Sequence, residues 1–115
     1  MGELFWRFSV NEMFFFLDFN NRKIRLTDER LHHIETDHLE LIGQGEKISE
    51  VLAHPDIVVQ SRTDNEVELF YKFFQKTPVT SKYLCVAVKT TKDSFILTTY
   101  FTDTIKKGKI LWTKT

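Results

Sequence analysis

The sequence predicts an α+β domain in which two N-terminal helices pack on a four- to five-stranded antiparallel sheet. Two observations lead to this prediction. Residues 27–55 contain two stretches with apolar side chains at helical spacing, and beyond Pro55 apolar side chains recur at every second residue. A chain of 115 residues is long enough for one core, so we expect a single domain over residues 1–115.

The first 26 residues form an aromatic segment whose secondary structure the sequence leaves open. Residues 5–10 favour a strand, whereas the run 14–16 fits either a second strand or a turn of buried helix. Residues 23–26 alternate between polar and apolar side chains and predict a short strand. The structure of residues 1–22 as a whole is therefore not predicted.

The helical part of the chain is predicted over residues 27–55. Thr27 is a suitable N-cap, because its hydroxyl can accept a hydrogen bond from a free N–H of the first turn. A first helix is expected over residues 28–38, and Gly43 then marks a loop. A second helix, with Ile48 and the residues one turn later on its apolar face, should end near Pro55.

The sheet is predicted over residues 56–115. Each strand is read from period-two alternation, and turn-forming residues lie between the strands. The strand over residues 83–89 has apolar residues on both faces, which is typical of a central strand. The five expected strands cover residues 57–61, 67–75, 83–89, 94–102 and 110–112.

Composition and charge restrict the classes of function. Sixteen basic and sixteen acidic residues give a net charge of zero, which argues against indiscriminate nucleic-acid binding but allows a local basic cleft. The single cysteine, Cys85, forms no internal disulfide and fits a reducing compartment. The first residues lack the features of a secretory signal, and the apolar run 13–19 is too short to span a membrane. We therefore expect a cytoplasmic protein that does not bind membranes.

Several phrases of the chain resemble the barnase–EndoU–colicin–RelE (BECR) superfamily of small ribonucleases, and most closely its phage-associated branch. Together these phrases cover roughly residues 25–112. The helix of that branch reads arginine, bulky apolar residue, any residue, histidine, isoleucine, and here His33 takes the position of the family histidine. A second histidine of the family precedes proline, whereas here His38 precedes Leu39. The matching phrases are 27–34, 35–40, 51–58, 82–89 and 95–100.

The resemblance implies a metal-independent endoribonuclease, toxin-like or phage-linked, that cleaves RNA through a 2′,3′-cyclic phosphate. Such cleavage needs a base for the 2′-hydroxyl proton, an acid for the leaving oxygen and cations for the phosphorane. The partners that it implies are the RNA substrate and a cognate antitoxin or inhibitor protein. The sequence does not predict the oligomeric state.

Two histidines are candidates for acid/base catalysis, because the imidazole pKa lies near neutrality. His33 is the first candidate, and Asp37 one turn later could orient its ring. His38 lies about 140° further around an ideal helix, so the two converge only if the helix ends before His38. The alternative for His33 is a surface histidine with an ion-pair neighbour.

Four further candidates come from the predicted sheet. Arg62 ends a strand and could bind phosphate, or it could be a solvated charge at the sheet edge. Lys89 ends a central strand, where it must either emerge into water or meet an anion. Thr98 and Tyr100 share a strand face, and the resemblance implies that this pair binds the scissile phosphate. Their alternative is ordinary strand propensity.

No metal site and no cofactor are expected. His33, Asp37 and His38 have no established ligand spacing, Cys85 has no partner cysteine, and there is no phosphate-binding glycine loop. The competing hypothesis is a non-catalytic RNA- or protein-binding module on the same fold. Two observations favour that alternative: the net charge is zero, and Leu39 stands where the resembled family has a proline after its second histidine.

Overall fold

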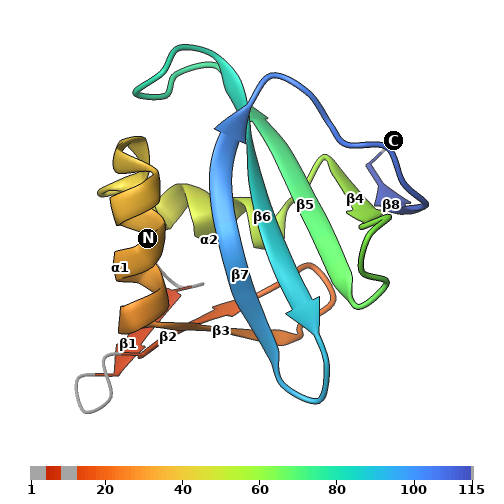
Figure 1. The fold of residues 1–115 in the computed structure, drawn as a ribbon, viewed down its shortest axis with the longest axis horizontal. Coiled ribbons are helices and arrows are strands. Elements are labelled where there is room, and N and C mark those ends of the chain that lie inside the picture. The colour runs from red at the N-terminus through yellow and green to blue at the C-terminus, as the bar shows by residue number, and fades with distance from the viewer. Residues whose placement is uncertain (1–4, 9–12, 115) are drawn as a thin grey trace.

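The computed structural model describes the backbone of residues 5–8 and all atoms of residues 13–114. The described residues form one eight-stranded sheet in the order β1-β2-β3-β7-β6-β5-β4-β8, two α-helices and a short 3-10 helix η1. Figure 1 shows α1 beside β7, with α2 crossing behind β6 and β5. The elements are β1 (Phe5–Phe8), β2 (Met13–Leu17), β3 (Lys23–Thr27), α1 (Asp28–Asp37), η1 (Leu39–Leu41), α2 (Gly45–Ala53), β4 (Ile57–Gln60), β5 (Val67–Phe74), β6 (Lys82–Thr90), β7 (Ser94–Thr102) and β8 (Ile110–Thr113).

The predicted fold class was wrong. Three strands precede the helices, and the sheet is mixed rather than antiparallel, because β3 pairs with β7 in the parallel direction. The second half of the chain does form an antiparallel set of strands, but this set is one part of a larger sheet. The helix and strand bounds from Thr27 onward lie within a few residues of those predicted.

The aromatic N-terminal segment was hard to interpret because its alternation is hidden. In β2, Phe14 and Phe16 are buried, whereas Phe15 between them is only half-buried on the opposite face. Since the outward position is also phenylalanine, polarity does not reveal the period of two. The strand expected over residues 5–10 is β1 as far as Phe8, and positions 9 and 10 lie outside the described residues.

The parallel contact between β3 and β7 is short and leaves room for a helix. Only Ile24 with Ser94 and Arg25 with Phe95 pair in register. The chain then enters α1, where the Arg30 N–H donates to Thr27 Oγ1 at 3.1 Å, as expected for an N-cap. Helix α1 packs against both β3 and β7, so it fills the space where the two strands separate.

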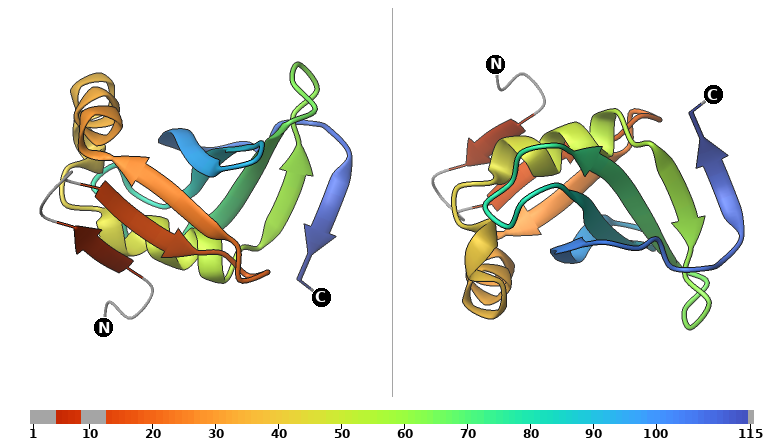
Figure 2. Two further views of the ribbon diagram at one scale, coloured as in Figure 1. Left: turned by 90° about the horizontal axis from the view of Figure 1, so that it is seen from below. Right: turned by 90° about the horizontal axis from the view of Figure 1, so that it is seen from above.

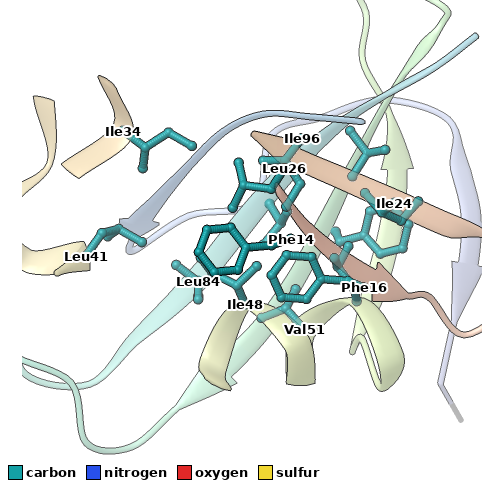
Figure 3. Close-up of a cluster of buried hydrophobic side chains, with 14 of the residues drawn as sticks. Phe14, Phe16, Ile24, Leu26, Ile34, Leu41, Ile48, Val51, Leu84 and Ile96 are labelled. Carbon is teal, nitrogen blue, oxygen red and sulfur yellow. The ribbon is translucent and has the colours of Figure 1, made fainter. Parts of the chain in front are cut away.

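The sheet curls around α2. This helix contacts β2 as well as β5 and β6, which are not neighbours of β2 in the sheet, so the sheet must bend to bring them to one helix. Figure 2 shows this curved arrangement from two sides. Ile48 and Val51 of α2 meet Phe14, Phe16 and Leu84 in a dry core between helix and sheet (Figure 3).

The opposite surface of the sheet, which we name the outer face, carries the residues that alternate with this core. Tyr71, Cys85 and Ala87 are buried there. The connection between β7 and β8 covers part of them, because Ile105 packs on this cluster and the Lys106 N–H donates to Tyr71 Oη at 3.1 Å. A Cβ at Gly108 would overlap the backbone oxygen of Gln60, so the connection can approach β4 this closely only with glycine.

No helix among the described residues is long and apolar enough to cross a membrane.

Candidate active site at the end of helix α1

His38 lies where α1 ends, and its imidazole faces the outer-face residue Tyr100. The His38 N–H donates to Ile34 O at 2.8 Å, which closes the helix and turns the chain away. The ring centroids of His38 and Tyr100 are 6.1 Å apart at an interplanar angle of 32°. The His38 side chain is 34% exposed, so solvent or a ligand can reach the imidazole. Glu40 Oε2 is 3.7 Å from His38 Nδ1.

Lys106 brings a positive charge to the same place. Its Nζ lies 5.9 Å from the centroid of the Tyr100 ring, within the range of a cation–π contact. Lys106 is exposed and makes no ion pair with any described residue. The Tyr100 ring of β7 therefore has two neighbours, the imidazole that follows α1 at 6.1 Å and an ammonium of the β7–β8 connection at 5.9 Å.

A buried polar cluster lies below Tyr100. Burial raises the pKa of Tyr100 above its ordinary value, and the nearby Cys85 and Tyr71 raise it further. Burial likewise raises the pKa of Cys85 to about 11 and that of Tyr71 to about 12. The Tyr100 hydroxyl oxygen is buried and has no hydrogen-bond partner among the described residues. These groups are therefore neutral at physiological pH, and we assign them to packing rather than to proton transfer.

Thr98 lies two residues before Tyr100 on the same face. The β6–β7 register pairs Thr98 with Ala87 and Tyr100 with Cys85, both of which are outer-face residues. Thr98 is half-buried, so its hydroxyl lies near the surface. Thr99 points the other way, is fully buried and donates to Cys85 O at 2.7 Å. Of the two threonines, only Thr98 belongs to the surface that carries His38 and Tyr100.

His33, the first catalytic candidate from the sequence, is not part of this cluster. It is exposed on α1 and makes no hydrogen bond or ion pair with the described residues, including Asp37. Its neighbour Ile34 is the residue of α1 that enters the core. Helix α1 ends at Asp37, so His38 does not continue the helix and its side chain leaves in a different direction.

Arg62 and Lys89 lie at the other end of the sheet, around the β4–β5 turn. The Lys89 ammonium is 2.6 Å from Asp64 Oδ2 and 3.4 Å from Glu66 Oε1. Asp64 raises the pKa of Lys89, and the Lys89 ammonium holds the pKa of Asp64 below its usual value. Lys89 is four residues from Cys85 along β6, or roughly 13 Å at strand spacing, so neither cation joins His38. Arg62 is exposed in the turn itself.

The sequence therefore named His38, Tyr100 and Thr98 but missed Lys106. Lys106 belongs to a basic run, 106–109, that precedes the last strand. The run was visible in the sequence, but its position over Tyr100 depends on the path of the β7–β8 connection. The signal that could have identified it is Gly108 within the run, because a glycine there suggests a close crossing over the sheet.

A pocket of about 850 Å³ lies elsewhere, between the β2–β3 turn, the C-terminal end of α2 and strands β5, β4 and β8. Its three amino and guanidinium groups are already paired: Arg22 with Asp18 and Glu68, and both lysines, Lys72 and Lys114, with Asp56. The pocket therefore offers little charge to an anionic substrate. The described residues contain no group of three or more His, Cys, Asp or Glu side chains placed to hold a metal ion.

No protein-family model matches the chain, and comparisons with curated proteins and with solved structures found no match either.

Proposed function

We propose that this chain is a small metal-independent endoribonuclease whose acid/base group is His38. The observation that supports the proposal is that the Tyr100 ring has both the accessible imidazole of His38 and the exposed ammonium of Lys106 as neighbours. An imidazole that can exchange protons near neutral pH and a cation that can meet phosphate are the parts that this chemistry requires. The resemblance to the BECR ribonucleases supports the same reaction.

The proposed reaction begins with His38 accepting the proton of an RNA 2′-hydroxyl. The 2′-oxygen then forms a bond to phosphorus, and the bond from phosphorus to the 5′-oxygen breaks. The leaving 5′-oxygen takes a proton from water, and the imidazolium later returns its proton to solvent. The products are a 2′,3′-cyclic phosphate and a 5′-hydroxyl, and no metal ion or cofactor takes part.

Lys106 has the role of stabilising the phosphorane. Negative charge develops on the equatorial phosphate oxygens during attack, and an ammonium nearby lowers the energy of that state. Lys106 is available for this role because none of the described carboxylates pairs with it. Lys89 is less suited to it, because Asp64 and Glu66 already neutralise its charge.

Thr98 and Tyr100 have positioning roles in this proposal. The Tyr100 hydroxyl is buried, so the ring acts as a support between His38 and Lys106 rather than as a proton donor. The Thr98 hydroxyl lies on the same face of β7 and can donate to a phosphate oxygen. Both roles follow from side-chain direction on one strand face.

The test is incubation of the purified protein with total RNA in excess chelator, followed by analysis of the RNA ends. We expect cleavage that survives chelation and leaves 2′,3′-cyclic phosphate and 5′-hydroxyl ends. The matched control is His38→Ala, which should be inactive, alongside His33→Ala, which should remain active. Cleavage that chelator abolishes and added zinc or magnesium restores would overturn the proposal.

The toxin-like role rests on the resemblance alone, and we propose a cytoplasmic site of action because that is where cellular RNA is available. Induced expression in a bacterial host should slow growth, and His38→Ala should relieve the effect. An inhibitor protein is the partner that such a role requires. If the parent and His38→Ala affect growth equally, the growth effect has another cause.

A further inference from the structure

A row of alternating aromatic and basic side chains crosses the outer face of the sheet, away from His38. Phe15 of β2 pairs directly with Arg25 of β3, Arg25 pairs with Phe95 of β7, and Phe95 pairs with Lys89 of β6. Each of these residues alternates with a residue of the core around α2, so all four side chains point to the outer face. Adjacent strands are about 4.8 Å apart, so the row is continuous across four strands.

Cations lie over the rings of this row. Arg25 Cζ is 5.4 Å from the centroid of Phe95, and Lys23 Nζ is 4.7 Å from the centroid of Phe15. Both distances are within the range of cation–π attraction. The row therefore contains two cation–π pairs, Lys23 with Phe15 and Arg25 with Phe95.

The positive charge of Arg25 is not neutralised by a carboxylate of any described residue. Its Nε is buried and has no hydrogen-bond partner, and its guanidinium makes no ion pair with any described residue. The residue as a whole is only half-buried, so a phosphate in the adjoining pocket can pair with the charge of its guanidinium even though Nε itself is closed to solvent. Lys89, in the same row, differs because Asp64 and Glu66 hold its ammonium.

A pocket of about 620 Å³ opens beside Arg25, between the β2–β3 hairpin and the β6–β7 turn. Arg22, Lys23, Arg25 and Lys92 line it, whereas Asp93 is the one carboxylate among its described lining residues. Lys23 and Lys92 are exposed and form no ion pair with described residues. In a chain with zero net charge, this is a local excess of positive charge next to aromatic rings.

We propose that this row and its pocket form a binding track for single-stranded RNA. Phosphates would occupy the pocket on Arg25, Lys23 and Lys92, and bases would pack beside them against the half-buried ring of Phe95. Single-strand binding surfaces combine these two features, a cationic groove and aromatic side chains. An acidic peptide would match the charges but would make no use of the rings.

The track rests on the proposed function in one respect, since it would guide the substrate strand toward His38. Phe95 and Tyr100 lie on the same strand, five residues apart, or roughly 16 Å at strand spacing. A strand held at both places would span more than one nucleotide. The enzyme would therefore bind the RNA at a distance from the bond that it breaks.

The test is fluorescence anisotropy with a labelled, fully 2′-O-methylated single-stranded oligonucleotide, which lacks the 2′-hydroxyl needed for cleavage. The variants are Arg25→Gln and the double variant Lys23→Gln/Lys92→Gln, each checked for folding by circular dichroism. The matched control is Lys47→Gln, because Lys47 also lies over a ring, that of Phe74 at 5.7 Å, but on the helix side of the sheet. If Arg25→Gln does not fold, the double variant of the two exposed lysines still gives a result.

We expect Arg25→Gln to weaken binding roughly tenfold, and we expect the double variant to reduce the dependence of log Kd on log salt by about 1.4, or about 0.7 per cation. Lys47→Gln should bind like the parent. Equal binding by all variants, equal weakening by all three, or no binding by the parent would overturn the track. Cleavage by the parent with unchanged binding by the variants would reject the track alone. Binding through the track without any cleavage would reject the nuclease alone.

Discussion

The imidazole of His38 rests against the ring of Tyr100, with the two centroids 6.1 Å apart. This contact joins the end of α1 to the C-terminal part of β7 through side chains alone. The N–H of His38 donates to Ile34 O at 2.8 Å, and this bond sets where the backbone leaves the helix and from which point the side chain starts. The position of the imidazole therefore depends on where α1 ends.

Replacement of each of the three histidines should show which one takes part in cleavage. His38→Ala is expected to lower the rate of RNA cleavage by roughly 10² to 10⁴-fold, the usual contribution of a positioned proton-transfer group. His33→Ala and His32→Ala should keep nearly the full rate, because both side chains are exposed on α1 away from Tyr100. Initial rates on one RNA substrate measure the contrast. Loss of activity in His33→Ala instead would move the acid/base role back to the helix surface.

Two lysines allow a second comparison. Lys106→Gln should slow cleavage by at least roughly tenfold, since the phosphorane would lose a cation. Lys89→Gln should leave the rate within about twofold, because Asp64 and Glu66 already neutralise that ammonium. Rates at saturating RNA distinguish this effect from weaker binding. The reverse order of effects would place the reacting phosphate at the β4–β5 turn.

The cluster below Tyr100 predicts loss of stability at alkaline pH. In the unfolded chain a thiol ionises near pH 8.5 and a phenol near pH 10, whereas the fold raises the pKa of Cys85 to about 11 and that of Tyr71 to about 12. Because the folded state holds these protons more tightly, its advantage is complete below about pH 8.5 and is lost as pH rises toward 11 and 12.

Urea unfolding at pH 8, 9 and 10 tests this expectation. One such group changes the free energy of unfolding by at most about 1.4 kcal/mol per pH unit. The Cys85→Ala variant should show a shallower fall with pH than the parent, even though removal of the thiol lowers its stability at every pH. Parallel curves for the two proteins would contradict the assignment to Cys85.

The β2–β3 turn depends on one buried carboxylate. Asp18 Oδ1 accepts from the backbone N–H groups of Asn20 and Arg22, and Asp18 Oδ2 accepts from Arg22 Nε at 2.7 Å. Asp18→Ala should lower the free energy of unfolding by about 2–4 kcal/mol, because it leaves these donors without an acceptor. Glu68→Gln should cost less than about 1 kcal/mol, since Arg22 keeps its bond to Asp18. Chemical denaturation at pH 7 measures both, and equal losses would contradict the central role of Asp18.

Much of the chain from Thr27 onward could be predicted because its local patterns agree with the fold. Thr27 caps α1 as expected, and the strands after Pro55 show their alternation openly. The fold class could not be obtained in this way. The pairing of Arg25 with Phe95 joins two strands that are far apart in the sequence, and neither strand carries a local mark of its partner.

The candidate site was predictable only in part. The sequence offers His33 and His38, and the choice between them depends on the residue at which the helix ends. Arg62 and Lys89 have the right chemistry, but the hairpin between β4 and β5 places Asp64 beside Lys89. The first outcome depends on a helix end that the sequence fixes only to within a residue or two, and the second depends on a contact between residues 25 positions apart.

The short parallel contact between β3 and β7 also affects how the protein is made. On the ribosome, the β2–β3 hairpin emerges early, but the edge of β3 has no neighbour until Ser94 and Phe95 are synthesised. Contacts between such distant segments form slowly and leave strand edges open in the meantime. Tyr100 follows this contact in the chain, so His38 acquires its neighbour only after β7 has been synthesised. If the proposed function holds, a nascent or truncated chain without Tyr100 would lack the assembled site and would not cleave the RNA that surrounds it.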